Sequence, residues 1–194
     1  MKAVLISIKP KWCELIAQGE KTVEVRKTRP KLDVPFKCYI YMTAGYASYP
    51  VTINGEPYIC HNNGGMVVIG EFVCDKIYTI DKDSVGFSYN TDKEITYFEF
   101  AENVLDLHCC LTDEELNKYL RIFKGYGWHI SNLVIYDNPK ELREFKKPCN
   151  HKNDCCTCDR YDYIGKKCYD EITRPPQSWC YVEELGGCEY VRPN

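Results

Sequence analysis

The sequence predicts an α+β fold in which short strands outnumber short helices and close into a small β-barrel. Alternating or β-branched runs recur along the chain, whereas helical patterns are few and short. Aromatic residues make up 13% of the sequence, including 16 Tyr, which suits a β-rich protein. Many short strands with helical plugs are typical of barrels. At 194 residues the chain can bury a core as one domain with an appendage.

The first elements are a strand, a helix and a second strand. Residues 4–8 are an apolar, β-rich run that ends before Pro10. Residues 10–18 carry apolar side chains at helical spacing, and Gly19 suits the position that follows a helix end. The next strand is therefore presented directly after a tight helix terminus.

The stretch 19–31 is a local positive feature on a chain of formal net charge -3. Its five basic residues, set against Glu20 and Glu24, are Lys21, Arg26, Lys27, Arg29 and Lys31. The middle of the stretch alternates and is β-branched, which predicts a strand with Val23 and Val25 toward the core. Glu24 and Arg26 are then expected side by side on an accessible face.

Further strands and two more helices follow. Thr112 and Glu115 predict a capping box at the start of a helix that runs to about residue 123 and ends at Gly125. The acid Glu71 lies inside the longest strand candidate. The other expected elements are strands at 37–42, 66–77, 128–136 and 178–182, a hairpin turn at Asn54-Gly55, and a short helix at 139–145.

The pattern Gly19-x-Lys21-x-x-x-x-Arg26 after a short helix resembles the signature of the ASCH domain family. That resemblance implies a PUA-like β-barrel associated with RNA. It covers most of 1–148, which we assign to the barrel. Residues 149–170 are a Cys-rich insertion and 171–194 are the closing strand and tail. The Cys-rich extension is similar to a bacterial and phage subset of the family.

The resemblance implies binding of RNA or a modified nucleoside in a basic pocket at the barrel mouth. Candidate contacts are Lys21, Glu24, Arg26, Lys27 and Arg29, with Trp128, Tyr41, Tyr46 and Tyr49 able to stack on an unpaired base. The net charge of -3 argues against a broad, nonspecific nucleic-acid surface. A single base or nucleoside fits this charge balance better than a duplex.

Two other functions stay open. Some family members are amidohydrolases that deacetylate 4-acetylcytidine. This resemblance would make Lys21 the base and Glu71 the acid, in one cavity that Arg26 also lines. Their nucleophilic Thr corresponds to Glu24 here, so whether the chain is an enzyme is left open. The other alternative is a protein-interaction module with a vestigial pocket. The plain structural alternatives are a surface Glu24–Arg26 pair and an outward-facing Glu71.

The 13 Cys predict buried thiols, a metal site or both rather than disulfides, because the N-terminus lacks a signal peptide and no segment suits a membrane span. We therefore expect a cytoplasmic protein. Residues 149–168 are Cys-rich but poor in large apolar side chains. The sequence predicts one structural zinc there, with His151 and Cys156 as spare ligands. The four predicted ligands are Cys149, Cys155, Cys158 and Cys168.

Overall fold

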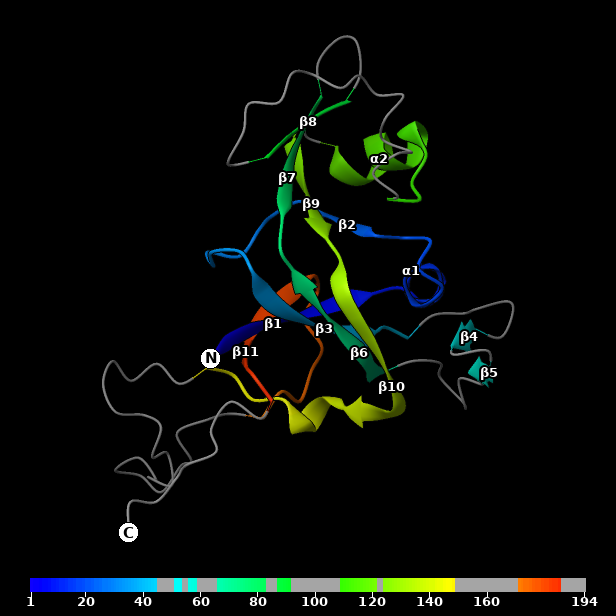
Figure 1. Ribbon diagram of the computed structural model, residues 1–194, viewed down its shortest axis with the longest axis vertical. Helices are drawn as coiled ribbons and strands as arrows, with labels where there is room; N and C mark the ends of the chain where they lie inside the picture. Colours follow the sequence, from blue (N-terminus) through cyan, green and yellow to red (C-terminus); the bar gives the residue numbers. More distant parts are fainter. Residues whose placement is uncertain are drawn as a thin grey trace.

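The fold is built on two β-sheets. A pair of neighbouring strands continues from one sheet into the other. The computed structural model describes residues 1–44, 51–53, 56–58, 66–82, 87–91, 109–121, 124–148 and 171–185. A five-stranded sheet has the order β10-β6-β3-β1-β11, and a four-stranded sheet has the order β2-β9-β7-β8. Figure 1 places the four-stranded sheet above the five-stranded one. Every pairing is antiparallel except that of β1 with β3.

The elements have the following bounds. The five-stranded sheet contains β1 (Lys2–Ile8), β3 (Phe36–Met42), β6 (Val67–Cys74), β10 (Ser131–Glu141) and β11 (Trp179–Glu183). The four-stranded sheet contains β2 (Val23–Arg26), β7 (Ile77–Lys82), β8 (Phe87–Thr91) and β9 (Lys124–His129). A separate hairpin pairs β4 (Val51–Ile53) with β5 (Glu56–Tyr58). The helices are α1 (Pro10–Ala17), α2 (Asp113–Leu120) and the 3-10 turn η2 (Leu142–Glu144).

Two strand pairs pass from one sheet into the other. Only Asp75 and Lys76 separate β6 from β7, and only Ile130 separates β9 from β10. β6 pairs with β10 below this junction, and β7 pairs with β9 above it. Within the described part of the chain, the outer strands of one sheet do not pair with those of the other. The fold is therefore α+β and mostly sheet, but the expectation of a closed barrel is wrong.

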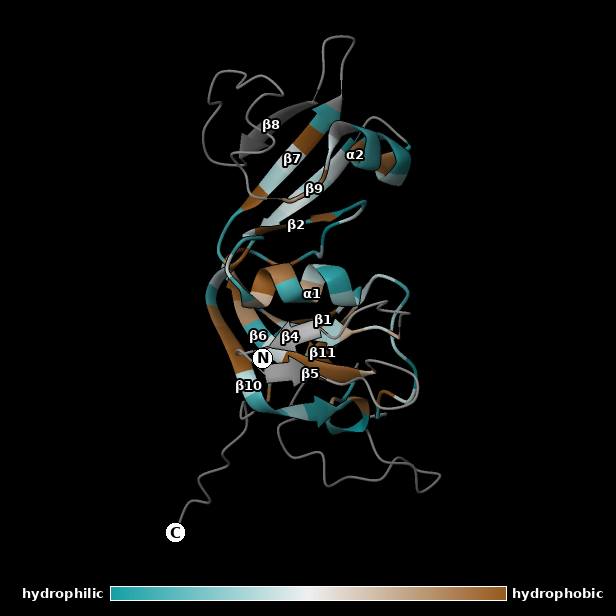
Figure 2. Ribbon diagram, turned by 90° about the vertical axis from the view of Figure 1, so that its right-hand side faces the viewer, coloured by the Kyte–Doolittle hydropathy of each residue, from teal (hydrophilic) through white to brown (hydrophobic). Residues whose placement is uncertain are grey.

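Three apolar clusters fill the spaces around these sheets. The largest lies between the two sheets and includes side chains from β1, β3, β6, β9 and α1. Figure 2 shows α1 between β2 and the five-stranded sheet. A second cluster covers the other face of the five-stranded sheet, and a third packs α2 against β2. As a result, β2 has protein on both faces.

Most predicted elements are confirmed near their expected positions. The helix after the first strand ends at Ala17, with Gly19 at φ +78°, and the capping box of Thr112 and Glu115 is present. The hairpin flanking residues 54–55 also forms. These elements rest on local signals such as turn residues and caps, which depend little on the rest of the fold.

Four predicted elements differ from the structure. The strand predicted at 66–77 is divided between β6 and β7, and the strand predicted at 128–136 lies across β9 and β10, because both bend at the sheet junction. Helix α2 ends at Leu120, where Arg121 takes φ +48°, rather than near Gly125. The helix expected at 139–145 is replaced by the end of β10 and the turn η2. No described helix is long and apolar enough to cross a membrane.

Candidate functional site

The end of α1 places Lys21 at the entrance to β2. Pro10 begins the helix, where a missing N–H costs nothing, and Gly19 reverses the chain direction in the left-handed region. The backbone N–H groups of Glu20 and Lys21 both donate to the carbonyl of Leu15, at 2.9 and 3.0 Å. This tight turn holds Lys21 against the helix instead of leaving it in solvent.

Strand β2 buries its charged side chains as well as its valines. Val23 and Val25 lie in the cluster under α2, as the alternation predicted. Glu24 and Arg26 alternate with these valines and therefore face the other side of β2. Figure 2 shows α1 and β1 on that side of the strand, and Arg26 contacts the Ser7 carbonyl of β1. Lys21, Glu24 and Arg26 are only 2, 6 and 7% exposed. The prediction that this face is accessible is therefore wrong, although the adjacency of Glu24 and Arg26 is confirmed.

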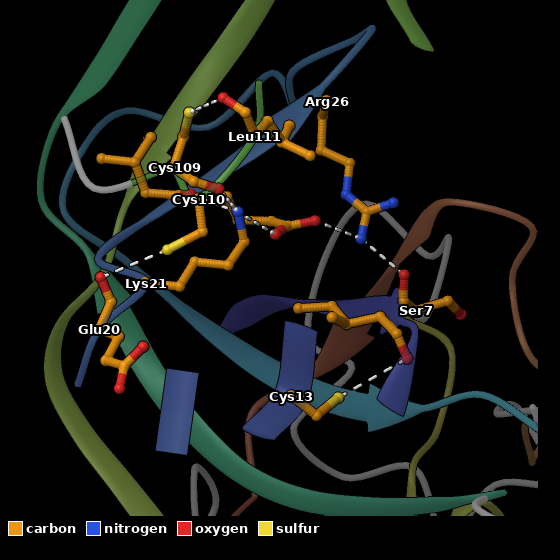
Figure 3. Close-up of polar contacts among 11 residues, drawn as sticks. Ser7, Cys13, Glu20, Lys21, Arg26, Cys109, Cys110 and Leu111 are labelled. Carbon is orange, nitrogen blue, oxygen red and sulfur yellow. Dashed lines mark hydrogen bonds and ion pairs between the residues drawn. The ribbon is translucent and has the colours of Figure 1, made fainter. Parts of the chain in front are cut away.

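Lys21, Glu24 and Arg26 form a buried ion cluster, which we call the KER cluster. Glu24 Oε1 lies 3.0 Å from Arg26 Nη2, and Glu24 Oε2 lies 3.4 Å from Lys21 Nζ. Lys21 Nζ also donates to the backbone carbonyls of Val23 at 2.9 Å and Cys109 at 2.5 Å. Arg26 Nη2 donates to the carbonyl of Ser7 at 2.6 Å (Figure 3).

The charges of the KER cluster do not balance. Among the described residues, two cations surround one carboxylate, which leaves one excess positive charge in a buried place. Removing charge from water is costly, so buried ions in proteins are normally paired and fully hydrogen-bonded. Trp12 adds a second favourable contact, because the Nζ of Lys21 lies 5.2 Å from the centre of its ring. The cluster therefore favours a further group that is negatively charged or rich in hydrogen-bond acceptors.

Trp128 lies directly opposite Glu24 in the pairing of β2 with β9, so the two side chains share a face. It is fully buried, with its ring centre 5.9 Å from those of Phe36 and Trp179. It lies beside Glu24, but a fully buried ring has no free face on which a base could stack. Tyr41 is only 1% exposed as well. Tyr46 and Tyr49 lie outside the described residues.

Two buried donors on this face lack a hydrogen-bond acceptor. Arg26 Nε and Trp128 Nε1 are the only buried side-chain nitrogens or oxygens without a partner in the described part of the chain. Leaving a buried donor unsatisfied costs about 1–3 kcal/mol, so native structures rarely tolerate it. Arg26 and Trp128 sit on diagonal positions of the β2–β9 ladder, where long side chains are within reach of each other.

The neutral thiol of Cys38 borders the same space. Burial raises its pKa well above the usual range, even though the nearby Arg26 guanidinium acts in the opposite direction. Cys38 therefore adds no negative charge that could compensate Arg26. The imbalance of the KER cluster is not corrected by this neighbour.

Glu71 lies elsewhere. In the pairing of β3 with β6 it stands opposite Tyr39, whose ring belongs to the second cluster, while Cys38 and Phe72 face the first. Glu71 Oε1 is 2.9 Å from Lys37 Nζ, and its Oε2 accepts a 2.6 Å bond from the Tyr136 hydroxyl. The expectation that Glu71 shares a cavity with Lys21 and Arg26 is wrong, because it projects from the opposite face of the sheet.

The polar contacts of Glu71 lower the pKa of its carboxyl group. Burial acts to raise the pKa of this carboxyl, but the hydrogen bonds from Tyr136 and Lys37 outweigh it and hold the pKa below its ordinary value. Burial and the Glu71 charge together raise the pKa of the Tyr136 phenol. Lys37 also reaches Glu184 at 3.6 Å, beyond the end of β11. The group therefore ties β3, β6, β10 and the segment after β11 together.

The remaining basic candidates lie after β2. Lys27 is exposed, and its Nζ lies 5.3 Å from the centre of the Tyr119 ring. Arg29 is half-buried. The intervening loop is fixed to β11, because Trp179 Nε1 donates to the hydroxyl of Thr28 at 3.1 Å. Lys27 is thus the predicted contact that is open to a ligand.

The sequence gives no signal for several groups that complete the site. Ser7 and Cys109 contribute through backbone carbonyls, which any residue carries. Outside this site, the Tyr136 hydroxyl that contacts Glu71 likewise comes from 65 positions away in sequence. Only the three-dimensional fold brings these acceptors and donors to their charged partners.

The predicted zinc ligands Cys149, Cys155, Cys158 and Cys168 lie outside the described residues. Among the residues that the structure describes, no group of three or more His, Cys, Asp or Glu side chains could hold a metal ion. The described cysteines are free thiols, and those of the N-terminal 74 residues are buried. These buried thiols pack as small apolar side chains.

Comparison with known proteins points to one family. The family model described as "ASCH domain" matches residues 6–81, which include the whole KER cluster. The fold is similar to the crystal structure of an ASCH protein from Zymomonas mobilis, with a TM-score of 0.54 and 16% identity over 94% of this chain and 89% of that one. A tyrosine-to-phenylalanine variant of that protein matches with a TM-score of 0.54 and 16% identity, covering 95% of this chain and 92% of that one. No curated protein gave a significant match.

Proposed function

Because the chain belongs to the ASCH domain family, we propose that it binds RNA or a modified nucleoside at the KER cluster. The observation that carries this proposal is the pair of unsatisfied buried donors, Arg26 Nε and Trp128 Nε1. Both lie on the face of β2 and β9 that holds Glu24. A ligand that supplies acceptors here removes the cost of leaving them unpaired.

Nucleic-acid components match the chemistry of this face. Base carbonyls, ring nitrogens and phosphate oxygens are acceptors, and Arg is the side chain that most often donates to them in pairs. The excess positive charge of the cluster favours a ligand that is anionic or strongly polar. Glu24 provides the complementary acceptor for an exocyclic amino group. The site can thus recognise a base edge that presents both acceptors and donors.

Burial sets the kinetics of this binding. Lys21, Glu24 and Arg26 are at most 7% exposed, so a ligand engages them only after their cover opens. Binding that requires a conformational change is slower than the roughly 10⁵–10⁷ M⁻¹s⁻¹ that is usual for protein association. We therefore expect association rate constants below this range, with little dependence on solvent viscosity.

The test is the affinity of variants for a short single-stranded RNA, measured by fluorescence anisotropy. Arg26→Met removes the charge and the donor, and a hydrogen bond to a charged group contributes roughly 1.5–3 kcal/mol, so binding should weaken by about tenfold or more. Trp128→Phe keeps an aromatic ring but removes Nε1–H, and should weaken binding by about fivefold. Far-UV circular dichroism checks that each variant folds.

Arg174→Met is the matched control, because Arg174 is exposed, lies far from β2 in sequence and is not part of the KER cluster. It makes the same change in charge and should leave the affinity unchanged. Equal affinities for native protein, Arg26→Met and Trp128→Phe, with all three folded, would overturn the proposal. A loss in all variants including Arg174→Met would point to nonspecific charge attraction and would overturn it as well.

The same geometry argues against amide hydrolysis. Hydrolysis through a nucleophile needs a hydroxyl or thiol beside a base. Glu24 occupies the nucleophile position, and its carboxylate is held between Lys21 and Arg26. Glu71, the expected acid, projects from the other face of the five-stranded sheet. Protein interaction through the Cys-rich insertion stays a prediction, since that segment lies outside the described residues.

A further inference from the structure

A basic and aromatic surface lies at the C-terminal end of α2. Its members share exposure to solvent, and we call them the α2 patch: Lys27, Lys118, Tyr119, Arg121 and Lys124. Tyr119 is one of the few large apolar or aromatic side chains that are exposed in the described part of the chain, at 36%. The Nζ of Lys27 lies over its ring at 5.3 Å.

Packing brings these residues together from three elements. Leu120, at the end of α2, lies against Gly125 of β9, where an added Cβ would meet the Leu120 side chain at 2.6 Å. The same added atom would lie 3.4 Å from the backbone carbonyl of Arg26. Lys124 precedes Gly125 and Lys27 follows Arg26, so both flank the contact on which α2 ends. Figures 1 and 2 show α2 beside β9 and β2 at this end of the four-stranded sheet.

The helix dipole explains only part of this pattern. Cations near a helix C-terminus are favourable, which accounts for Lys118 and Arg121. It does not account for Lys27, which follows β2, for Lys124 on β9, or for an exposed tyrosine among them. The acids of α2, Asp113, Glu114 and Glu115, lie in its first turn. Asp81 is the cross-strand partner of Lys124.

We infer that the α2 patch binds the phosphates and one base of a single-stranded nucleic acid whose neighbouring nucleotide occupies the KER cluster. The argument rests on the proposed function of that cluster. Arg26 belongs to the cluster and Lys27 to the patch, so one peptide bond joins the buried site to the exposed surface. An oligonucleotide extends from one to the other, whereas a free nucleoside reaches only the first.

The chemistry of the patch fits this ligand. Lysine and arginine neutralise phosphates, and a tyrosine ring stacks on any base, so together they bind a single strand with little sequence preference. The whole chain carries a formal net charge of -3, so this local positive surface stands out against a repulsive background. The positive surface therefore directs a strand toward the end of β2.

The experiment compares two probes, a fluorescein-labelled short single-stranded RNA and free cytidine, on the full chain. Replacing both Lys118 and Lys124 by Gln should reduce the slope of log K against log salt for the RNA by about 1.4, since each phosphate contact contributes roughly 0.7 for single strands. Tyr119→Ala should weaken RNA binding at least about fivefold. Neither change should alter the affinity for cytidine.

The control replaces Lys2 and Lys147 by Gln, because both are exposed and belong to the five-stranded sheet side of the molecule. An unchanged salt slope and RNA affinity in the patch variants would overturn the inference, and would indicate that an acidic protein or no partner uses this surface. The proposed function would survive that result if Arg26→Met still weakened binding. If Arg26→Met did not change RNA affinity and the patch variants did, the KER cluster would not be a binding site and the proposed function would be wrong. The inference that one strand occupies both the KER cluster and the α2 patch would then fail as well.

Discussion

Glu24 and Arg26 form a 3.0 Å ion pair on a strand whose two faces are both buried. Residues two apart on a strand point to the same side, so the pair follows directly from the spacing in the sequence. Its burial follows from the packing of α1 and β1 on that side. A buried charged cluster adds little net stability to a fold, because the cost of desolvating the charges offsets much of their mutual attraction. We interpret it as the chemical part of a binding site.

The first prediction concerns the carboxylate of the KER cluster. Glu24→Gln leaves Lys21 and Arg26 buried without a countercharge, so the free energy of unfolding should fall by about 3–5 kcal/mol. Urea unfolding followed by tryptophan fluorescence measures this change. Glu20→Gln is the matched control, since Glu20 is exposed and should change stability by less than about 0.5 kcal/mol. Equal stability of the two variants would contradict the assigned role of Glu24.

The second prediction concerns acid stability. The folded-state pKa of Glu71 is lowered from 4.5, mainly through the Tyr136 and Lys37 contacts that oppose burial. The stability that this ionised carboxylate contributes is therefore present above pH 4.5 and is lost as the pH falls through the lower folded-state value. Tyr136→Phe should reduce stability near neutral pH by roughly 1 kcal/mol, with a smaller effect in acid.

Urea unfolding of native protein and Tyr136→Phe at neutral and acid pH provides the measurement. Tyr126→Phe is the control, because Tyr126 is a partly buried tyrosine on β9 that does not contact Glu71. A stability difference between native protein and Tyr136→Phe that stays constant through the acid range would show that the Glu71 contact does not set the pH dependence.

The third prediction concerns enzyme activity. With Glu24 at the nucleophile position and Glu71 on the other sheet face, release of acetate from 4-acetylcytidine should be weak or absent. Thr22 is the nearest hydroxyl in sequence, and its carbonyl accepts a 2.8 Å bond from the N–H of Ile130. Chromatographic detection of cytidine measures the reaction. Rapid turnover that persists in Thr22→Ala would require a mechanism that this geometry does not supply.

The fourth prediction concerns the Cys-rich insertion. Residues 149–168 contain too little apolar surface to offset the roughly 1–2 kcal/mol of entropy that each ordered residue costs. One structural zinc could, since such sites contribute about 10–16 kcal/mol in small fingers. Protein purified without chelator should contain about one zinc per chain, bound by Cys149, Cys155, Cys158 and Cys168.

Elemental analysis of variants tests this assignment. Replacing Cys155 and Cys158 by Ser should abolish zinc binding, whereas Cys180→Ser should not, because Cys180 lies on β11 and its pKa is raised by burial. A native protein without zinc, or one that keeps zinc after the double replacement, would be inconsistent with the predicted site.

Local signals in the sequence were sufficient to predict several individual elements of the fold. The turn at Gly19, the capping box at Thr112 and the alternation of β2 each depend on neighbouring residues, and each is present. The family resemblance carried by Lys21 and Arg26 led to the same region. Only the adjacency of Glu24 and Arg26 in the ion cluster could be predicted, because periodicity places them on one face. Periodicity does not indicate what covers that face, so their burial could not be predicted.

The errors have a common physical origin in long-range packing. Periodicity predicted one strand at 66–77, but the chain bends at Asp75 and Lys76 and enters a second sheet. Glu71 was grouped with Lys21 because sequence cannot specify which face of a sheet a distant residue occupies. The acceptors of Ser7 and Cys109 are backbone atoms, so no residue type could have identified them.

The most direct test of the proposed binding site is a crystal structure of the protein with a bound short single-stranded RNA. The measured quantities are the distances from Arg26 Nε and Trp128 Nε1 to the nearest ligand acceptor. We predict that at least one of them lies within about 3.2 Å, as expected for a hydrogen bond. RNA bound elsewhere, with both nitrogens unpaired or bonded only to water, would contradict the assignment of the KER cluster as the binding site.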